Sequence, residues 1–93
     1  MNYIKAAEVS SNNALLDDAI RQGLSLMRNP DISEAQFRIW VEYSKNLLGL
    51  ISKNPVFMTN YLNVVIAAYS SSLTISQRLG MCLRYLIEIQ TVI

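Results

Sequence analysis

The sequence lacks histidine altogether and contains a single cysteine, Cys82. Without histidine there is no Ser–His or Cys–His nucleophile and no imidazole ligand for a metal ion. One cysteine excludes an intramolecular disulfide and favours a reducing compartment. Because Cys82 stands between Met81 and Leu83 in an apolar segment, we expect a buried, unreactive thiol.

Other signs of a reaction centre are missing as well. Asp17 and Asp18 are adjacent, so on a helix their side chains diverge by about 100° and do not share a site. We interpret them as residues of a first helical turn, where the helix dipole favours negative charge. No glycine-rich loop offers a cradle for phosphate. We therefore expect no catalytic residue, no metal and no cofactor, and we expect that the chain is not an enzyme.

Charge is scarce. Only 16% of the 93 residues are charged and the net charge is +1, whereas typical domains have about 25% charged residues. This favours neither a nucleic-acid surface nor a polybasic membrane patch. By contrast, 52% of the residues are hydrophobic. A domain of this size buries only roughly 60–65% of the surface of its unfolded chain, so we expect surplus apolar surface to form an interface.

Residues 54–77 carry no charge, which raises the question of a membrane span. Polar residues interrupt this stretch and leave an apolar block of about nine residues, whereas a span needs about 20. The N-terminus contains Lys5 and no apolar core of a signal peptide. We expect a soluble, cytoplasmic protein without a membrane span.

The apolar spacing predicts a single all-α domain over residues 1–93, with no strand pattern. We expect three to four helices in a helical hairpin array or a small bundle, over about 14–28, 33–52, 55–70 and 75–92. The run Ser10–Asn13 favours caps over helix interiors, so we expect a break there. Residues 1–10 would then be a flexible segment or a short helix.

Three helix starts have local signatures. Ser33 with Gln36, and Thr74 with Gln77, match the capping box. Asn54 before Pro55 combines a capping residue with a proline at the first helical position.

The second long helix is amphipathic. Its apolar face begins at Phe37 and ends near Ile51. The opposite face has charges of alternating sign, three and four residues apart, which we interpret as a solvated ladder: Glu34, Arg38, Glu42 and Lys45.

The last two helices are apolar over wide arcs, and we expect the first half of the chain to cover only one side of them. Gly80 would permit a close approach between helices. Aromatic residues and methionine are enriched in the cores of interfaces. We therefore predict that an uncovered apolar side binds a protein partner or a second copy, through these residues: Tyr61, Val65, Tyr69, Met81 and Tyr85.

Residues 16–31, with Leu16-Asp17-Asp18-Ala19-Ile20, Leu24 and Asn29-Pro30, resemble the second helix of a tetratricopeptide repeat and its terminal proline. Residues 33–43 would begin the next repeat, so the resemblance covers about 30 residues. It implies a concave surface that binds a protein, as in small helical chaperones such as those of bacterial secretion. A plain three- or four-helix bundle remains an open alternative.

Two alternative functions remain. A small DNA-associated regulator of the helix-turn-helix type would use the turn at residues 70–74, with Gln77, Arg78 and Arg84 facing the duplex. A phage- or plasmid-type inhibitor that occludes a larger protein would use the same apolar surface as a chaperone or adaptor. The leading hypothesis from the sequence is a non-enzymatic protein–protein interaction module.

Overall fold

The structure, a computed structural model, describes the backbone of residues 2–70 and 72–92 and the side chains of residues 13–70 and 72–92. In this part of the chain there are four helices and no strand: α1 (Asn2–Met27), α2 (Glu34–Ile51), α3 (Pro55–Tyr69) and α4 (Ile75–Gln90). The prediction of an all-α chain is confirmed.

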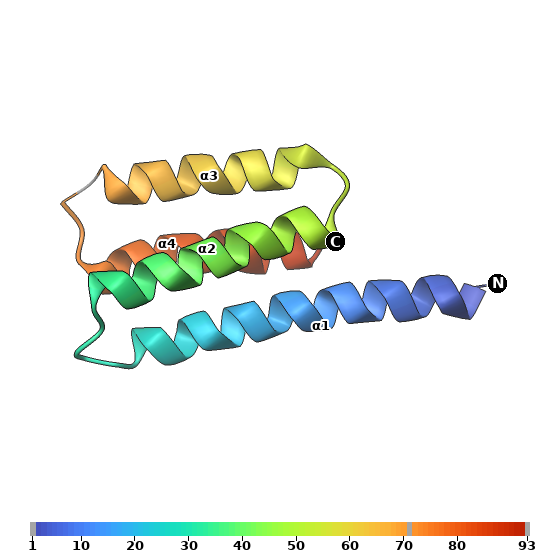
Figure 1. Cartoon of the computed structure of the whole chain (residues 1–93), viewed down its shortest axis with the longest axis horizontal. Coiled ribbons are helices and arrows are strands. Elements are labelled where there is room, and N and C mark those ends of the chain that lie inside the picture. Colours follow the sequence, from blue (N-terminus) through green and yellow to red (C-terminus); the bar gives the residue numbers. More distant parts are fainter. Residues whose placement is uncertain (1, 71, 93) are drawn as a thin grey trace.

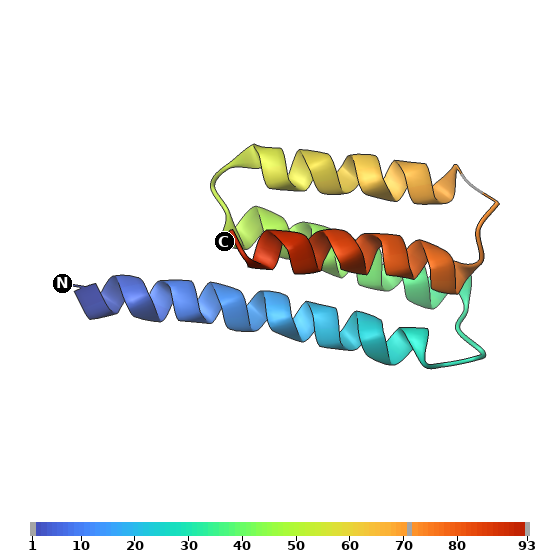
Figure 2. The same ribbon diagram turned by 180° about the vertical axis from the view of Figure 1, so that it is seen from behind.

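The helices form a closed antiparallel bundle. α1 and α3 lie on opposite sides of the pair formed by α2 and α4, as the two opposite views show (Figures 1 and 2). α1 packs against both α2 and α4, and α3 also packs against both. The contact between α1 and α4, the first and last helices, closes the ring, so the small bundle describes the chain better than an open hairpin array.

The start of α1 differs from the prediction. The helix runs without interruption from Asn2 to Met27 and extends beyond the other three helices (Figure 1). Serine and asparagine cost only a few tenths of a kcal/mol each in a helix, and Ser10–Asn13 has no Glu or Gln placed to complete a capping box. Asp17 is therefore in the middle of a helix, where it pairs with Arg21 at 2.8 Å rather than with the helix dipole.

The three predicted helix starts are confirmed by their hydrogen bonds. The Gln36 amide donates to Ser33 Oγ at 3.2 Å, and the Ser33 amide donates to Gln36 Oε1 at 2.9 Å. Thr74 and Gln77 repeat both bonds at 3.2 and 3.0 Å. At α3, the Val56 amide donates to Asn54 Oδ1 at 3.1 Å. These bonds satisfy amides that would otherwise lack a partner at a helix N-terminus.

One hydrophobic core connects all four helices. The Trp40 indole lies in it and donates its N–H to the carbonyl oxygen of Ala19 at 2.9 Å, which ties α2 to α1. The buried hydrophobic residues come from every helix: Leu16, Ala19, Ile20, Phe37, Trp40, Val41, Leu47, Leu48, Ile51, Tyr61, Val65, Ala68, Leu79, Cys82, Leu83, Leu86 and Ile89.

Of the three glycines, Gly23 has the tightest surroundings, not Gly80. A Cβ atom at Gly23 would lie 2.6 Å from Leu83 Cδ2 and 2.7 Å from Trp40 Cζ2. At Gly80 the nearest atom to such a Cβ would be Met27 Cε at 3.9 Å, an ordinary contact. The expectation that Gly80 permits close packing is therefore wrong, because its position on α4 faces only the flexible end of Met27.

A small polar group lies inside the core. Ser44 is buried and donates its hydroxyl to the carbonyl oxygen of Val41 at 3.0 Å. Tyr61 Oη lies 2.7 Å from Ser44 Oγ, so the two hydroxyls are hydrogen-bonded inside the core. Burial raises the pKa of Tyr61, and burial raises the pKa of the Cys82 thiol to about 11 against an opposing hydrogen bond with Tyr61. Cys82 is thus a buried thiol, as predicted.

We expect Gly23→Ala to lower the free energy of unfolding by about 1–2 kcal/mol, because overpacking outweighs the gain in helix propensity. Gly49→Ala is the matched control: Gly49 is exposed and its Cβ would meet Met58 Cε at 3.5 Å. That variant should be about 0.5 kcal/mol more stable than the wild type. Urea unfolding followed by circular dichroism measures both, and equal effects of the two substitutions would contradict the close approach at Gly23.

We expect the bundle to lose stability between about pH 9 and pH 11. The pKa of Cys82 is raised in the folded state, so its contribution is fully present below the unfolded value of 9.0 and disappears as the pH rises through about 11. Tyr61, whose pKa is also raised, acts in the same direction. Urea midpoints at pH 7, 9 and 11 should fall with pH in the wild type and fall less steeply in Cys82→Ala. Parallel slopes for the two proteins would exclude Cys82 as a cause.

Candidate protein-binding surface

Two of the five predicted interface residues are core residues. Tyr61 is 0% exposed and Val65 is 8% exposed. Their face of α3 packs on α2 and α4, and Tyr61 also stacks on Tyr85 with 5.8 Å between ring centroids. A partner therefore cannot reach Tyr61 or Val65 while the bundle is closed, because the chain itself covers them.

Tyr69 belongs to an exposed stripe on α3. It is 38% exposed, and its ring lies 5.6 Å from that of Phe37, which places it on the side of α3 that faces α2. Leu62 and Ile66 precede it at helical spacing and are 38% and 61% exposed. The three residues form a continuous apolar stripe, which we call the α3 stripe.

Met81 and Tyr85 lie on a different side of the bundle. Together with Val64, Arg84 and Glu88 they line a shallow groove of about 300 Å³ between α3 and α4. Tyr85 donates its hydroxyl to the carbonyl oxygen of Phe57 at 2.8 Å, and burial raises its pKa. Arg84 and Glu88 form an exposed ion pair at 3.5 Å on the rim. Met81 and Tyr85 are thus separated from Tyr69, and the predicted surface is not continuous.

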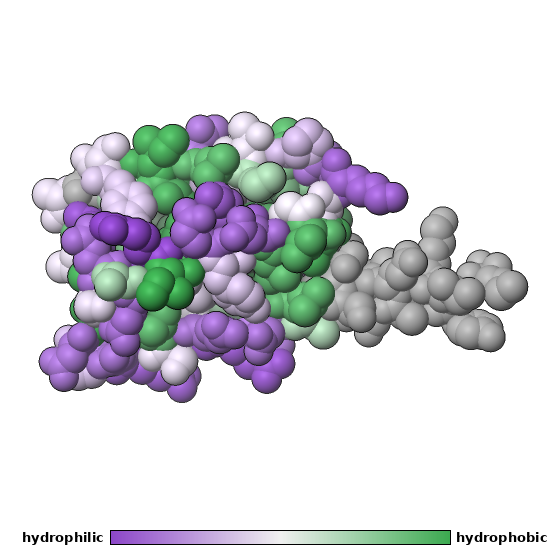
Figure 3. Space-filling model, in the orientation of Figure 1, coloured by the Kyte–Doolittle hydropathy of each residue, from purple (hydrophilic) through white to green (hydrophobic). Residues whose placement is uncertain are grey.

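The surplus apolar surface is not confined to the last two helices. α4 has a wide apolar arc, but α1, α2 and α3 all pack on it, so for α4 the expectation that only one side is covered is wrong. α3 does keep an uncovered apolar side. Large exposed hydrophobic residues occur on the first two helices as well: Leu15, Leu24, Met27, Ile39 and Leu50. Figure 3 shows hydrophobic residues (green) over α2 and α3 on one face, with hydrophilic ones (purple) between them.

The exposed apolar residues on the outer face of α2 were not predicted. Ile39 is 69% exposed and Leu50 is 84% exposed, although both stand among charged and polar residues of that face. They are eleven positions apart, about three helical turns, so they lie on one side of the helix. An apolar residue inside the polar half of an amphipathic helix is the signal that could have found them.

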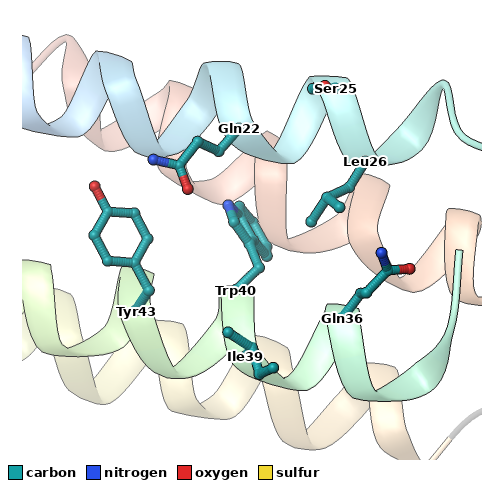
Figure 4. Close-up of a pocket in the computed structure, with 7 residues that line it drawn as sticks. All are labelled: Gln22, Ser25, Leu26, Gln36, Ile39, Trp40 and Tyr43. Atoms are coloured by element: carbon teal, nitrogen blue, oxygen red, sulfur yellow. The ribbon is translucent and has the colours of Figure 1, made fainter.

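A groove between α1 and α2 lies beside Ile39. It measures about 580 Å³, and no charged residue lines it: Gln22, Ser25, Leu26, Gln36, Ile39, Trp40 and Tyr43 (Figure 4). At its edge the Tyr43 hydroxyl donates to Asp18 Oδ2 at 3.2 Å; burial and this carboxylate raise the pKa of Tyr43. The groove can receive apolar or neutral polar groups, and its rim holds a carboxylate.

The geometry gives no support to the helix-turn-helix alternative. α3 and α4 run antiparallel along their whole lengths, whereas the helices of that motif cross at about 90–120° (Figures 1 and 2). Gln77 caps its own helix and Arg84 pairs with Glu88. Two of the three residues expected to face DNA are therefore engaged within α4.

In residues 13–70 and 72–92 no three His, Cys, Asp or Glu side chains gather where a metal ion could be held. Across the described helices, none combines the length and apolar character needed to cross a membrane.

No protein-family model, no curated protein and no solved structure matches the chain. The tetratricopeptide resemblance stays a prediction. What the geometry does provide is an apolar surface on α2 and α3 made of the α3 stripe, Ile39 and Leu50.

Proposed function

We propose that the chain is a non-enzymatic protein–protein interaction module of the small chaperone or adaptor type. It binds a protein partner or a second copy of itself through apolar side chains on the outside of the bundle. The observation that carries this proposal is the α3 stripe, in which Leu62, Ile66 and Tyr69 form one continuous exposed line. We further propose a reducing, cytoplasmic setting, which the single unpaired thiol of Cys82 supports.

The physical reason is that the bundle does not need these residues for its core. Tyr61, Val65 and Ala68 fill the inner side of α3, so Ile66, which is 61% exposed, could be polar at little cost to packing. Burying apolar surface stabilises a complex by about 25 cal/mol for each Å² removed from water. An exposed stripe at this spacing fits either a helix laid in a groove or a helix face of another bundle.

The binding surface that we propose combines α3 with α2 instead of α3 with α4. Ile39 and Leu50 extend the apolar surface across α2, while the α4 side offers only the shallow groove of Met81 and Tyr85 with its charged rim. Desolvating the Arg84–Glu88 pair on that rim would cost more than a small apolar contact returns.

The test compares two double variants at exposed positions. Leu62→Gln with Ile66→Gln changes the α3 stripe, and Leu24→Gln with Ile87→Gln changes two residues of similar exposure on α1 and α4. ANS fluorescence and affinity capture from the source cells are measured for each, with circular dichroism to verify folding. The stripe variant should lose about tenfold or more in capture, because two apolar contacts are removed, and the control should match the wild type.

The proposal fails if the wild-type chain binds no ANS, captures no protein and remains monomeric. It also fails if the stripe variant and the control capture partner protein equally poorly. The loss would then come from making the surface more polar in general, and not from the α3 stripe.

A further inference from the structure

We propose that a second copy of the chain occupies this surface, with the two α2 helices antiparallel about a twofold axis at Ile39. The inference rests on the function proposed above and names its partner. It follows from the arrangement of apolar and charged residues on the outer face of α2, which complements itself in this orientation.

The centre of the contact is apolar. Ala35, Ile39 and Tyr43 are spaced four residues apart and therefore lie on one side of α2. Ile39 is 69% exposed, Ala35 is exposed and Tyr43 is half-buried. Antiparallel pairing about Ile39 brings the two isoleucines together and sets each Ala35 against the Tyr43 of the second copy. A small residue opposite a large one lets the side chains of two helices interdigitate.

The charges of α2 are complementary under the same twofold. Glu34, Arg38, Glu42 and Lys45 alternate in sign along the helix. The midpoint of Arg38 and Glu42 is Trp40, one residue from Ile39. An antiparallel second copy centred near Ile39 therefore brings its Glu42 near Arg38, and this pair occurs twice. Exposed pairs of this kind contribute little affinity and fix orientation and register.

These charges are only partly used inside the chain. Lys45 Nζ pairs with Glu42 at 2.9 Å. In the described part of the chain, neither Glu34 nor Arg38 forms an ion pair, although each has an oppositely charged residue four positions away. The ladder that the sequence predicts within the helix is therefore incomplete, and Arg38 remains available to a carboxylate of a second copy.

Both flanks of α2 take part in the proposed contact. On the α1 side, each copy has a groove whose lining residues carry no charge (Figure 4), and the Asp18 carboxylate lies at its rim. On the α3 side, the contact between Phe37 and Tyr69 places the end of the α3 stripe beside the first turns of α2. Ile66 thus comes close to the axis and adds apolar contact.

The available area is enough for a dimer. α2 has 18 residues and is about 27 Å long. The face that it shares with α1 and α3 is 24 Å wide, the second extent of the molecule (Figure 1). If the whole of this face were covered, each copy would contribute roughly 650 Å², about 1,300 Å² in total, at the lower end of the range for specific interfaces. We therefore expect a dimer of moderate affinity that dissociates on dilution.

The first test is sedimentation velocity of the full chain over a range of concentrations. Wild-type protein should pass from monomer to dimer, Ile39→Lys should remain monomeric, and Ile87→Lys, on α4, should dimerise like the wild type. A wild type that stays monomeric at all concentrations overturns this inference. The module proposed above would still stand if its stripe variant lost ANS binding or capture.

The second test is a charge exchange. Arg38→Glu places a carboxylate opposite Glu42 of the second copy and should weaken the dimer about tenfold, since two attractive pairs become repulsive. The double variant R38E/E42R restores opposite charges across the twofold and should recover most of the affinity. A hetero-partner would gain nothing from the second substitution. Failure of R38E/E42R to recover, or a dimer that tolerates both Arg38→Glu and Ile39→Lys, overturns the antiparallel arrangement.

Discussion

The close approach of α1 at Gly23 is the constraint on which the arrangement of the helices depends. A side chain as small as a methyl group would overlap Trp40 of α2 and Leu83 of α4. The absence of that methyl group lets α1 contact both helices at once, and the bond from Trp40 to Ala19 holds α1 in register. Because α1 rests on α4, the ring closes, and Tyr61, Cys82 and the other apolar residues of α3 and α4 become core.

Closing the bundle also decides which apolar residues remain outside. α4 has three neighbours and shows little apolar surface apart from Ile87. α3 has two neighbours, so its apolar residues divide between an inner side at Tyr61 and an outer side at Ile66. The excess of hydrophobic residues that a short chain cannot bury therefore remains on the exposed sides of α1 and α3 and on the outer face of α2. The proposed function and the proposed dimer both follow from this exposed apolar surface.

Local signals predicted most of the fold. Capping at Ser33, Asn54 and Thr74 is decided by residues within four positions, and all three starts were predicted correctly. The start of α1 was missed because weak helix formers at Ser10–Asn13 are tolerated when no cap competes with them. Gly23 was missed for a different reason: its role depends on Leu83, sixty positions further along the chain.

The binding surface was less predictable than the fold. α3 is apolar over a wide arc, so periodicity alone cannot tell that Tyr61 faces the core and Ile66 faces outward. Only the positions of α2 and α4 decide between them. For Ile39 the information was present, since it stands between charged residues of an otherwise polar face. The sequence does not show that an uncharged groove lies beside Ile39; only the structure does.

The most direct test of the account is an amide NMR spectrum recorded over a dilution series. The account predicts that amides of α2 around Ile39 and of α3 around Ile66 shift together as the protein is diluted, while those at Leu24 and Ile87 remain unchanged. A spectrum independent of concentration, or shifts centred on α1 and α4, would contradict it.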